Sequence, residues 1–168
     1  MKCTELTNRL IIVRRGDMME VVRAKSEHIT EVANLFDQYR MFYKQESNLN
    51  GAIDFIMERI NNKDSVIFLV KEEEQYMGFT QLYPSFSSVS MKKLWILNDL
   101  YVTETARQKG VAQLLLNAAK KFAIESKAKA LDLQTAIDNK SAQALYEKNG
   151  YQVDKEFLSY SLNLENLK

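Results

Sequence analysis

The stretch Arg107-Gln108-Lys109-Gly110-Val111-Ala112 places small residues where a predicted strand gives way to a long amphipathic helix. Gly110 and Ala112 allow a ligand to approach the backbone closely. The first turn of a helix presents N–H groups without a partner inside the helix, and the helix dipole favours negative charge there. The stretch therefore indicates a site for an anion such as a pyrophosphate, although a tight turn that needs glycine only for its geometry would use the same residues. Its spacing differs from the P-loop and from the dinucleotide fingerprint.

A second chemical feature is a carboxylate in an apolar setting. Asp99 lies inside the predicted strand Trp95–Val102, whose other residues are mostly apolar. Such an aspartate is either a structural group satisfied by hydrogen bonds or a group that accepts a proton in catalysis. Because side chains alternate along a strand, we expect Asn98 to face the side opposite Asp99, unless a bulge intervenes.

Composition argues against several classes of site. The 168 residues include one cysteine, Cys3, and one histidine, His28. A zinc site normally draws on several such ligands, so we expect no metal. A Ser-His-Asp or Cys-His enzyme would have to use His28, which lies in a polar stretch; we expect a partly exposed histidine without a catalytic role. The formal net charge of +1 gives no reason to expect nucleic acid or a membrane as partner. With one cysteine, no long apolar run and no signal peptide, we expect a cytoplasmic protein.

The elements that must position these residues follow from hydrophobic periodicity and turn residues. The pattern predicts strand 21–23, helices 29–43 and 49–60, a hairpin of strands 65–71 and 76–83, a loop at 84–90, strand 93–102, helix 110–126, strand 130–135, helix 141–148 with a stop at Asn149-Gly150, and one or two strands in 151–163. Antiparallel hairpins come first, and strands alternate with helices later. This order predicts an α/β fold with one mixed sheet and helices on both faces.

Residues 1–18 are predicted to be an N-terminal extension to one domain of residues 19–168. Met18-Met19-Glu20 resembles an alternative start. Two interpretations stay open for the extension: a mis-assigned start codon, or an extra edge strand at Leu10–Arg14.

Two motifs together resemble the GCN5-related N-acetyltransferase (GNAT) family. The first is Arg107-x-x-Gly110-x-Ala112 at a strand-to-helix junction, with alanine where many members have glycine. The second is Asn139-x-x-Ala142-x-x-Leu145-Tyr146-Glu147-Lys148-Asn149-Gly150-Tyr151, at the family's usual distance from the first. The resemblance covers about residues 21–164. It implies a single-domain acyl-CoA N-acyltransferase fold, whose mostly antiparallel, twisted sheet splays open between two central strands, here 95–102 and 130–135.

The resemblance also implies the residues that hold acetyl-CoA. The amides of 108–112 would bind its pyrophosphate with Arg107 nearby, and Leu100 and Val102 would pair with the pantetheine arm like an added strand. Asn139 would hydrogen-bond that arm or the backbone near it. The full set expected to bind the co-substrate is Leu100, Tyr101, Val102, Arg107, Gln108, Lys109, Gly110, Val111, Ala112, Asn139, Ala142 and Tyr146.

The implied reaction is direct transfer of an acetyl group to an amine. Tyr146 would protonate the leaving thiolate, whereas without the resemblance it would be interpreted as a core aromatic. Asp99 is the candidate base, because most alkylamines are protonated near pH 7 and must lose a proton before attack.

The predicted acceptor pocket combines aromatic and polar residues from the first two helices and the end of the hairpin. Its candidate residues are Tyr39, Arg40, Tyr43, Gln45, Tyr83 and Phe86. We expect a small-molecule amine as acceptor, in an enzyme that forms a homodimer as many members do. The alternatives are a protein or peptide acetyltransferase acting on a lysine or N-terminal amine, and a non-catalytic CoA-binding module.

Overall fold

The computed structural model of this protein describes residues 3–6, 9–14 and 17–165. The chain divides into two compact units, Met1–Gln134 and Thr135–Lys168, and each is described by itself. The expected boundary between residues 18 and 19 stays a prediction.

The first unit is built on one mixed sheet, which in the described residues has seven strands in the order β1-β2-β3-β4-β5-β6-β7. All neighbours are antiparallel except β6 and β7, which are parallel. The mostly antiparallel sheet expected from the sequence is thus confirmed. The strands are β1 Cys3–Leu6, β2 Arg9–Arg14, β3 Asp17–Arg23, β4 Val66–Glu72, β5 Gln75–Ser87, β6 Lys92–Val102 and β7 Leu131–Leu133.

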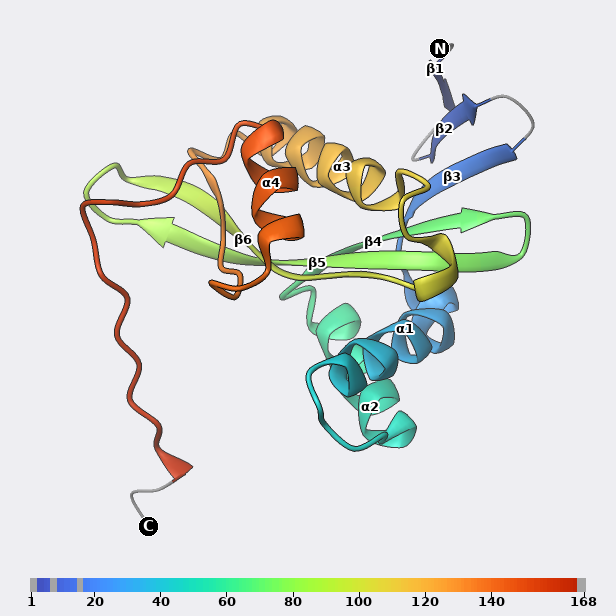
Figure 1. The fold of residues 1–168 in the computed structure, drawn as a ribbon, viewed down its shortest axis with the longest axis horizontal. Helices are drawn as coiled ribbons and strands as arrows, with labels where there is room; N and C mark the ends of the chain where they lie inside the picture. Colours follow the sequence, from blue (N-terminus) through green and yellow to red (C-terminus); the bar gives the residue numbers. More distant parts are fainter. Residues whose placement is uncertain (1–2, 7–8, 15–16, 166–168) are drawn as a thin grey trace. The chain divides into compact units, whose positions relative to one another are not determined.

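Helices cover both faces of this sheet (Figure 1). Helices α1 (Ile29–Phe42) and α2 (Leu49–Asn62) pack on one face, and α3 (Val111–Glu125) packs on the other. Side chains alternate along β4, so neighbouring residues face opposite sides of the sheet. Leu69 belongs to the hydrophobic cluster under α1 and α2. The ring of Phe68 faces the other side and lies 5.8 Å from the ring of Phe122 in α3. Burying each large apolar side chain contributes about 1.5–3 kcal/mol, so both helical layers are fixed to the sheet.

A β-bulge in β6 determines what faces the helices. In the β5–β6 ladder Leu82 pairs with Leu97 and Gln81 with Asp99, which leaves Asn98 as an extra residue. A bulge of this kind interrupts the alternation of side chains. Its consequence is that Asn98 and Asp99 both reach the α1–α2 side, as described below.

The expected splay lies beside the bulge. Strand β7 pairs with β6 only from Trp95 to Leu97, and no described strand pairs with that edge of β6 beyond Leu97. The N–H of Thr103 donates to the carbonyl of Met77 at 2.9 Å, on the β5 side. Because backbone groups alternate in direction, those of Leu100 and Val102 point to the opposite, open edge.

The predicted end of β5 at Tyr83 is wrong, because the strand continues through Pro84 to Ser87. The amide of Trp95, which lies opposite Pro84, donates to Ala130 on the β7 side. The two residues therefore form a non-hydrogen-bonded pair, and the nitrogen of Pro84 points to the outer edge of β5. Among the described strands none pairs with that edge beyond Leu82, so proline costs no ladder hydrogen bond.

The second unit contains helix α4 (Lys140–Lys148), whose C-cap is Asn149. Gly150 follows in a left-handed conformation (φ 89°), so the helix stops where the sequence predicts. The strands predicted in 151–163 are absent, and that prediction is wrong. The side chain of Asp154 accepts the N–H groups of Glu156 and Phe157 in a local turn that competes with an extended strand. Alternating apolar residues alone do not make a strand without a partner.

Candidate active site

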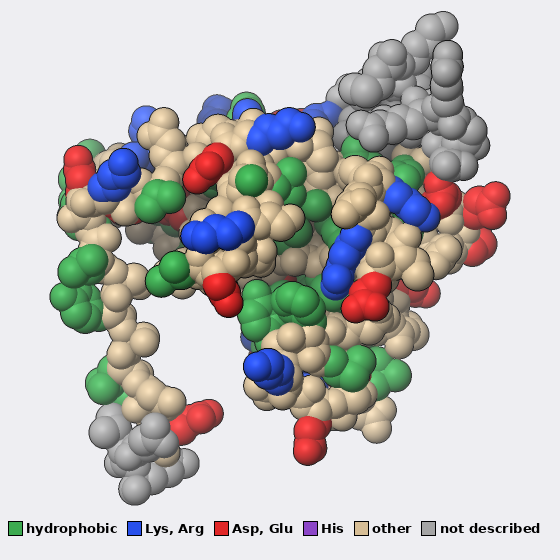
Figure 2. Space-filling model, viewed as in Figure 1, with side chains coloured by type: hydrophobic (Ala, Val, Ile, Leu, Met, Phe, Trp, Pro, Cys, Tyr) green, Lys and Arg blue, Asp and Glu red, His purple; other side chains and the backbone are tan. Residues whose placement is uncertain are grey.

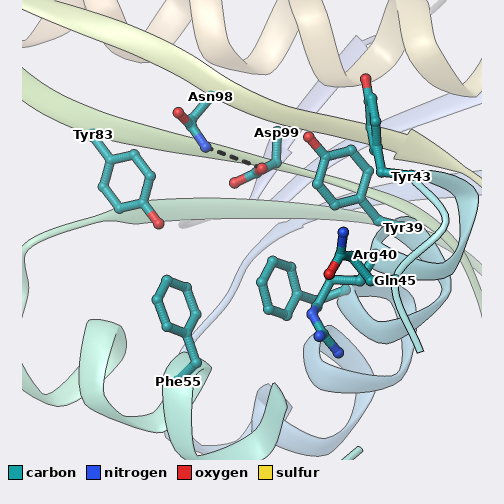
Figure 3. A pocket seen from close by; sticks show the side chains of 9 residues that line it. Tyr39, Arg40, Tyr43, Gln45, Phe55, Tyr83, Asn98 and Asp99 are labelled. Atoms are coloured by element: carbon teal, nitrogen blue, oxygen red, sulfur yellow. Dashed lines mark hydrogen bonds between the residues drawn. The ribbon is translucent and has the colours of Figure 1, made fainter. Parts of the chain in front are cut away.

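A cavity of about 320 Å³ opens between the α1–α2 layer and the sheet, and its labelled side chains converge from helices and strands (Figure 3). Five of the six predicted acceptor-pocket residues line it: Tyr39, Arg40, Tyr43, Gln45 and Tyr83. Phe86 is not among the lining residues, and its side chain is 75% exposed near the end of β5. The remaining lining residues are Phe36, Phe55, Asn98 and Asp99.

Asp99 is the buried charge of this pocket, only 4% exposed. The side-chain amide of Asn98 donates to its Oδ1 at 3.1 Å, so the bulge brings together two side chains that regular alternation would separate. Burial raises the pKa of Asp99, and its hydrogen bonds to Asn98 and Tyr39 oppose that rise only in part. A carboxylate with a raised pKa is a better proton acceptor than an exposed one.

The two tyrosines beside Asp99 are held in their protonated form. Burial and the nearby Asp99 charge raise the pKa of Tyr83 to about 12, and the same two causes raise the pKa of Tyr39 further. At neutral pH both hydroxyls therefore carry a proton that they can donate. The Tyr83 hydroxyl also accepts a hydrogen bond of 2.7 Å from Nε2 of Gln81, a fully buried residue that the sequence interpretation missed.

The side chain of Asp37 in α1 holds the loop between α1 and α2 in place. This buried carboxylate accepts hydrogen bonds from Ser47 Oγ (2.6 Å), the N–H of Asn48 (2.8 Å) and Arg40 (3.1 Å). The hydrogen bonds from Ser47 and Asn48 are the largest causes that hold the pKa of Asp37 below its usual value. Tyr43 and Gln45 lie in this loop, so Asp37 fixes one wall of the pocket.

The turn before α3 has the geometry that the anion-site motif predicts. Gln108 (φ 63°) and Gly110 (φ 90°) are both left-handed, and no side chain caps the helix N-terminus at Gly110. Arg107 lies over the ring of Phe42 at 5.8 Å. Phe42 ends α1, where Figure 2 shows a hydrophobic patch, and it is about half exposed. The uncapped amides fit an anionic ligand.

The open edge of β6 fits an extended ligand arm, because Leu100 and Val102 turn their backbone groups to it. Tyr101 is not brought there: its side chain is buried in the core under α1 and α2. The sequence interpretation missed Gly78, where a Cβ would lie 2.6 Å from the carbonyl oxygen of Tyr101. A glycine inside a strand pattern is the signal for such a close backbone approach.

The second unit holds the other predicted site residues. Tyr146 is buried in α4, and its ring meets that of Tyr151 edge-on at 5.8 Å. Asn139 caps α4, its Oδ1 accepting the N–H of Ala142 at 3.2 Å. The roles of Asn139, Ala142 and Tyr146 toward acetyl-CoA stay predictions.

Three further observations concern other kinds of site. Among the described residues no three His, Cys, Asp or Glu side chains gather to hold a metal ion. In that same part of the chain no helix has the length and hydrophobicity to cross a membrane. His28 accepts the N–H of Lys25 on Nδ1 at 3.2 Å, in the turn before α1.

Comparisons with known proteins agree with this geometry. Residues 29–151 match the model of the acetyltransferase (GNAT) family. A Bacillus subtilis protein named as an uncharacterized N-acetyltransferase, YhfO, is 49% identical over 146 residues, which cover 87% of this chain and 98% of the relative. The crystal structure of a probable acetyltransferase, 44% identical, superposes with a TM-score of 0.82 over 86% of this chain and 97% of that chain.

A third comparison supports the fold alone. Aminoglycoside N-acetyltransferase AAC(6')-Iy, solved in complex with CoA, is 17% identical and has a TM-score of 0.74, covering 90% of this chain and 99% of that one. The family match, by contrast, spans most of the chain, and the relatives above are closely similar in sequence. The chain therefore belongs to the GNAT family of acetyltransferases, enzymes that transfer an acetyl group from acetyl-CoA to an amine.

Proposed function

We propose that this enzyme acetylates the primary amine of a small molecule bound in the Asp99 pocket. The observation that carries the proposal is the cavity itself, which has a volume of about 320 Å³ and is lined by aromatic rings, the amides of Gln45 and Asn98 and the buried carboxylate of Asp99. Arg40 also lines it, and its guanidinium is paired with Asp37. Small-molecule pockets begin at about this size and combine apolar walls with a few fixed polar groups. Aromatic faces and a carboxylate both attract an ammonium group.

The open edge of β6 and the turn before α3 are the parts that would hold the co-substrate. Leu100 and Val102 offer unpaired backbone groups to an amide-containing arm, and the amides at 108–112 suit the pyrophosphate. The edge opens after Leu97, and the pocket begins at Asn98 and Asp99 on the same strand. When bound, acetyl-CoA supplies an acetyl group already activated as a thioester.

Asp99 would take the proton that the acceptor's ammonium must lose before its nitrogen can attack. Its raised pKa suits this role, and Asn98 and Tyr39 hold the carboxylate in place. Tyr146 would return a proton to the sulfur when the carbon–sulfur bond breaks. Direct transfer needs no covalent enzyme intermediate, because holding both reactants together supplies much of the rate.

A panel of amines tests the proposal. Wild-type protein with acetyl-CoA should release thiol with small cationic or zwitterionic amines, and Asp99→Asn should lower kcat/KM for each of them. The matched control is Asp132→Asn, because Asp132 is an exposed aspartate on the neighbouring strand β7. Turnover of lysine peptides or protein N-termini with no small amine would overturn the proposal in favour of a protein acetyltransferase. CoA binding without any turnover would favour a non-catalytic module. The homodimer and the cytoplasmic location stay predictions.

A further inference from the structure

Gln81 does not line the pocket, but it neighbours two residues that do, Asp99 and Tyr83. It pairs with Asp99 across the β5–β6 ladder, so the two side chains are neighbours on the same face of the sheet. Tyr83, two residues along β5, shares that face. The side chain of Gln81 is completely buried, and its Nε2 donates to the Tyr83 hydroxyl at 2.7 Å.

The amide of Gln81 is only half satisfied. Its Oε1 is buried and has no hydrogen-bond partner among the described residues. Most buried polar groups in proteins are paired, and an unpaired acceptor lowers stability. Among the described residues, the Gln81 side chain is therefore held by its hydrogen bond to the Tyr83 hydroxyl.

The hydrogen bond from Gln81 determines what the Tyr83 hydroxyl can do. The hydroxyl accepts the N–H of Gln81, so its own proton must point away from that amide. The pKa of about 12 keeps the proton on the oxygen at neutral pH. Tyr83 lines the cavity and therefore presents a fixed donor there, on the face that also carries the Asp99 acceptor.

We propose that Gln81 is a positioning residue that orients the Tyr83 hydroxyl as a hydrogen-bond donor, and that the pocket therefore selects amines carrying an oxygen acceptor. A hydroxyl, carbonyl or carboxylate of the substrate would accept from Tyr83 while its ammonium group binds Asp99. Amino alcohols and amino acids fit this pair of groups, whereas a plain alkylamine leaves the Tyr83 donor unpaired. The inference rests on the proposed function of the pocket.

Matched amines of equal size test the selection. Ethanolamine and propylamine have the same number of heavy atoms, as do 4-aminobutanol and pentylamine. In each pair the amino alcohol carries a hydroxyl where the alkylamine carries its terminal methyl group. In the wild type, kcat/KM should be higher for the amino alcohol of at least one pair by roughly 3–10-fold, the effect of one net hydrogen bond. Gln81→Met, which is similar in size and cannot donate, should bring that ratio close to one. Gln75→Met is the control, because Gln75 is exposed on the same strand.

Tyr83→Phe serves as a second variant in case Gln81→Met does not fold. It removes only the hydroxyl and should reduce the same ratio, and adding Gln81→Met to it should change the ratio no further. Equal kcat/KM for both members of each pair in the wild type, an unchanged ratio in a folded Gln81→Met variant, or an unchanged ratio in Tyr83→Phe would overturn the role of Gln81 while leaving the proposed function intact. Failure of the wild type to turn over any small amine would instead overturn the proposed function and this inference with it.

Discussion

Replacing Asp37 with alanine should loosen the loop that forms one wall of the pocket. The change removes three charge-assisted hydrogen bonds, from Ser47, from the N–H of Asn48 and from Arg40. Each such bond is worth about 1.5–3 kcal/mol when buried, but water can reach these donors once the carboxylate is gone. We therefore expect a loss of about 2–4 kcal/mol in the free energy of unfolding, which for a chain of this size lowers Tm by roughly 4–16 °C.

The pH dependence of this loss has a definite sign. The pKa of Asp37 is lower in the folded protein than in the unfolded chain, where the pKa of an aspartate is about 3.9. Its contribution to stability is therefore fully present above the unfolded value and disappears as pH falls through the lowered folded value. The difference in unfolding free energy between wild type and Asp37→Ala should be constant from about pH 6 to 8 and shrink below about pH 4.

The assay combines thermal unfolding across pH with steady-state kinetics. Because the loop carries Tyr43 and Gln45, KM for the amine should rise while KM for acetyl-CoA stays the same. Asp54→Ala is the control, because Asp54 is an exposed aspartate on α2. If Asp37→Ala unfolded at the same temperature as this control, or if its deficit did not depend on pH, the buried carboxylate would not anchor the loop.

Three further predictions concern the chemistry. Asp99→Asn should lower kcat/KM and flatten its rise with pH, because the amide of asparagine cannot accept the proton that the ammonium group must lose; a pH–rate profile identical to wild type would exclude Asp99 as the base. Gly110→Val should weaken CoA binding in calorimetry, because a β-branched residue is strained at φ 90° and crowds the turn; an unchanged Kd would contradict the anion site. Tyr146→Phe should lower kcat roughly 10²–10⁴-fold with acetyl-CoA binding intact, and a wild-type rate with chemistry rate-limiting would return Tyr146 to a core role.

The long helices and the glycine turn could be predicted from the sequence because their signals are local. Helix α3 begins at Val111, one residue after the predicted start, and its uncapped turn has the left-handed glycine that the motif requires. The order of elements along the chain followed from the same periodicity, and the splay followed from the family resemblance. Most of the predicted acceptor residues also line the cavity. They could be predicted because aromatic residues beside a polar loop are likewise a local pattern in the sequence.

What could not be predicted depends on pairing between distant residues. The bulge at Asn98 exists only in the β5–β6 register, so alternation within β6 alone cannot reveal it. Phe36 fits the apolar face of α1, so periodicity alone does not separate its contacts with the core from its place in the lining of the cavity. Gln81 gave no signal, since its importance comes from its partners Tyr83 and Asp99.

Two stretches of strand that lack a described partner on one side, in β5 and in β6, differ in sequence. On the outer edge of β5, Pro84 removes the N–H that another chain would need in order to extend the sheet, which is a common protection against aggregation. The edge of β6 at Leu100 and Val102 has no such protection, because a proline there would also exclude a ligand that pairs with the backbone. Binding of the co-substrate would then also shield a strand edge that is open to intermolecular strand addition, so the protein should remain soluble longer in storage when CoA is present.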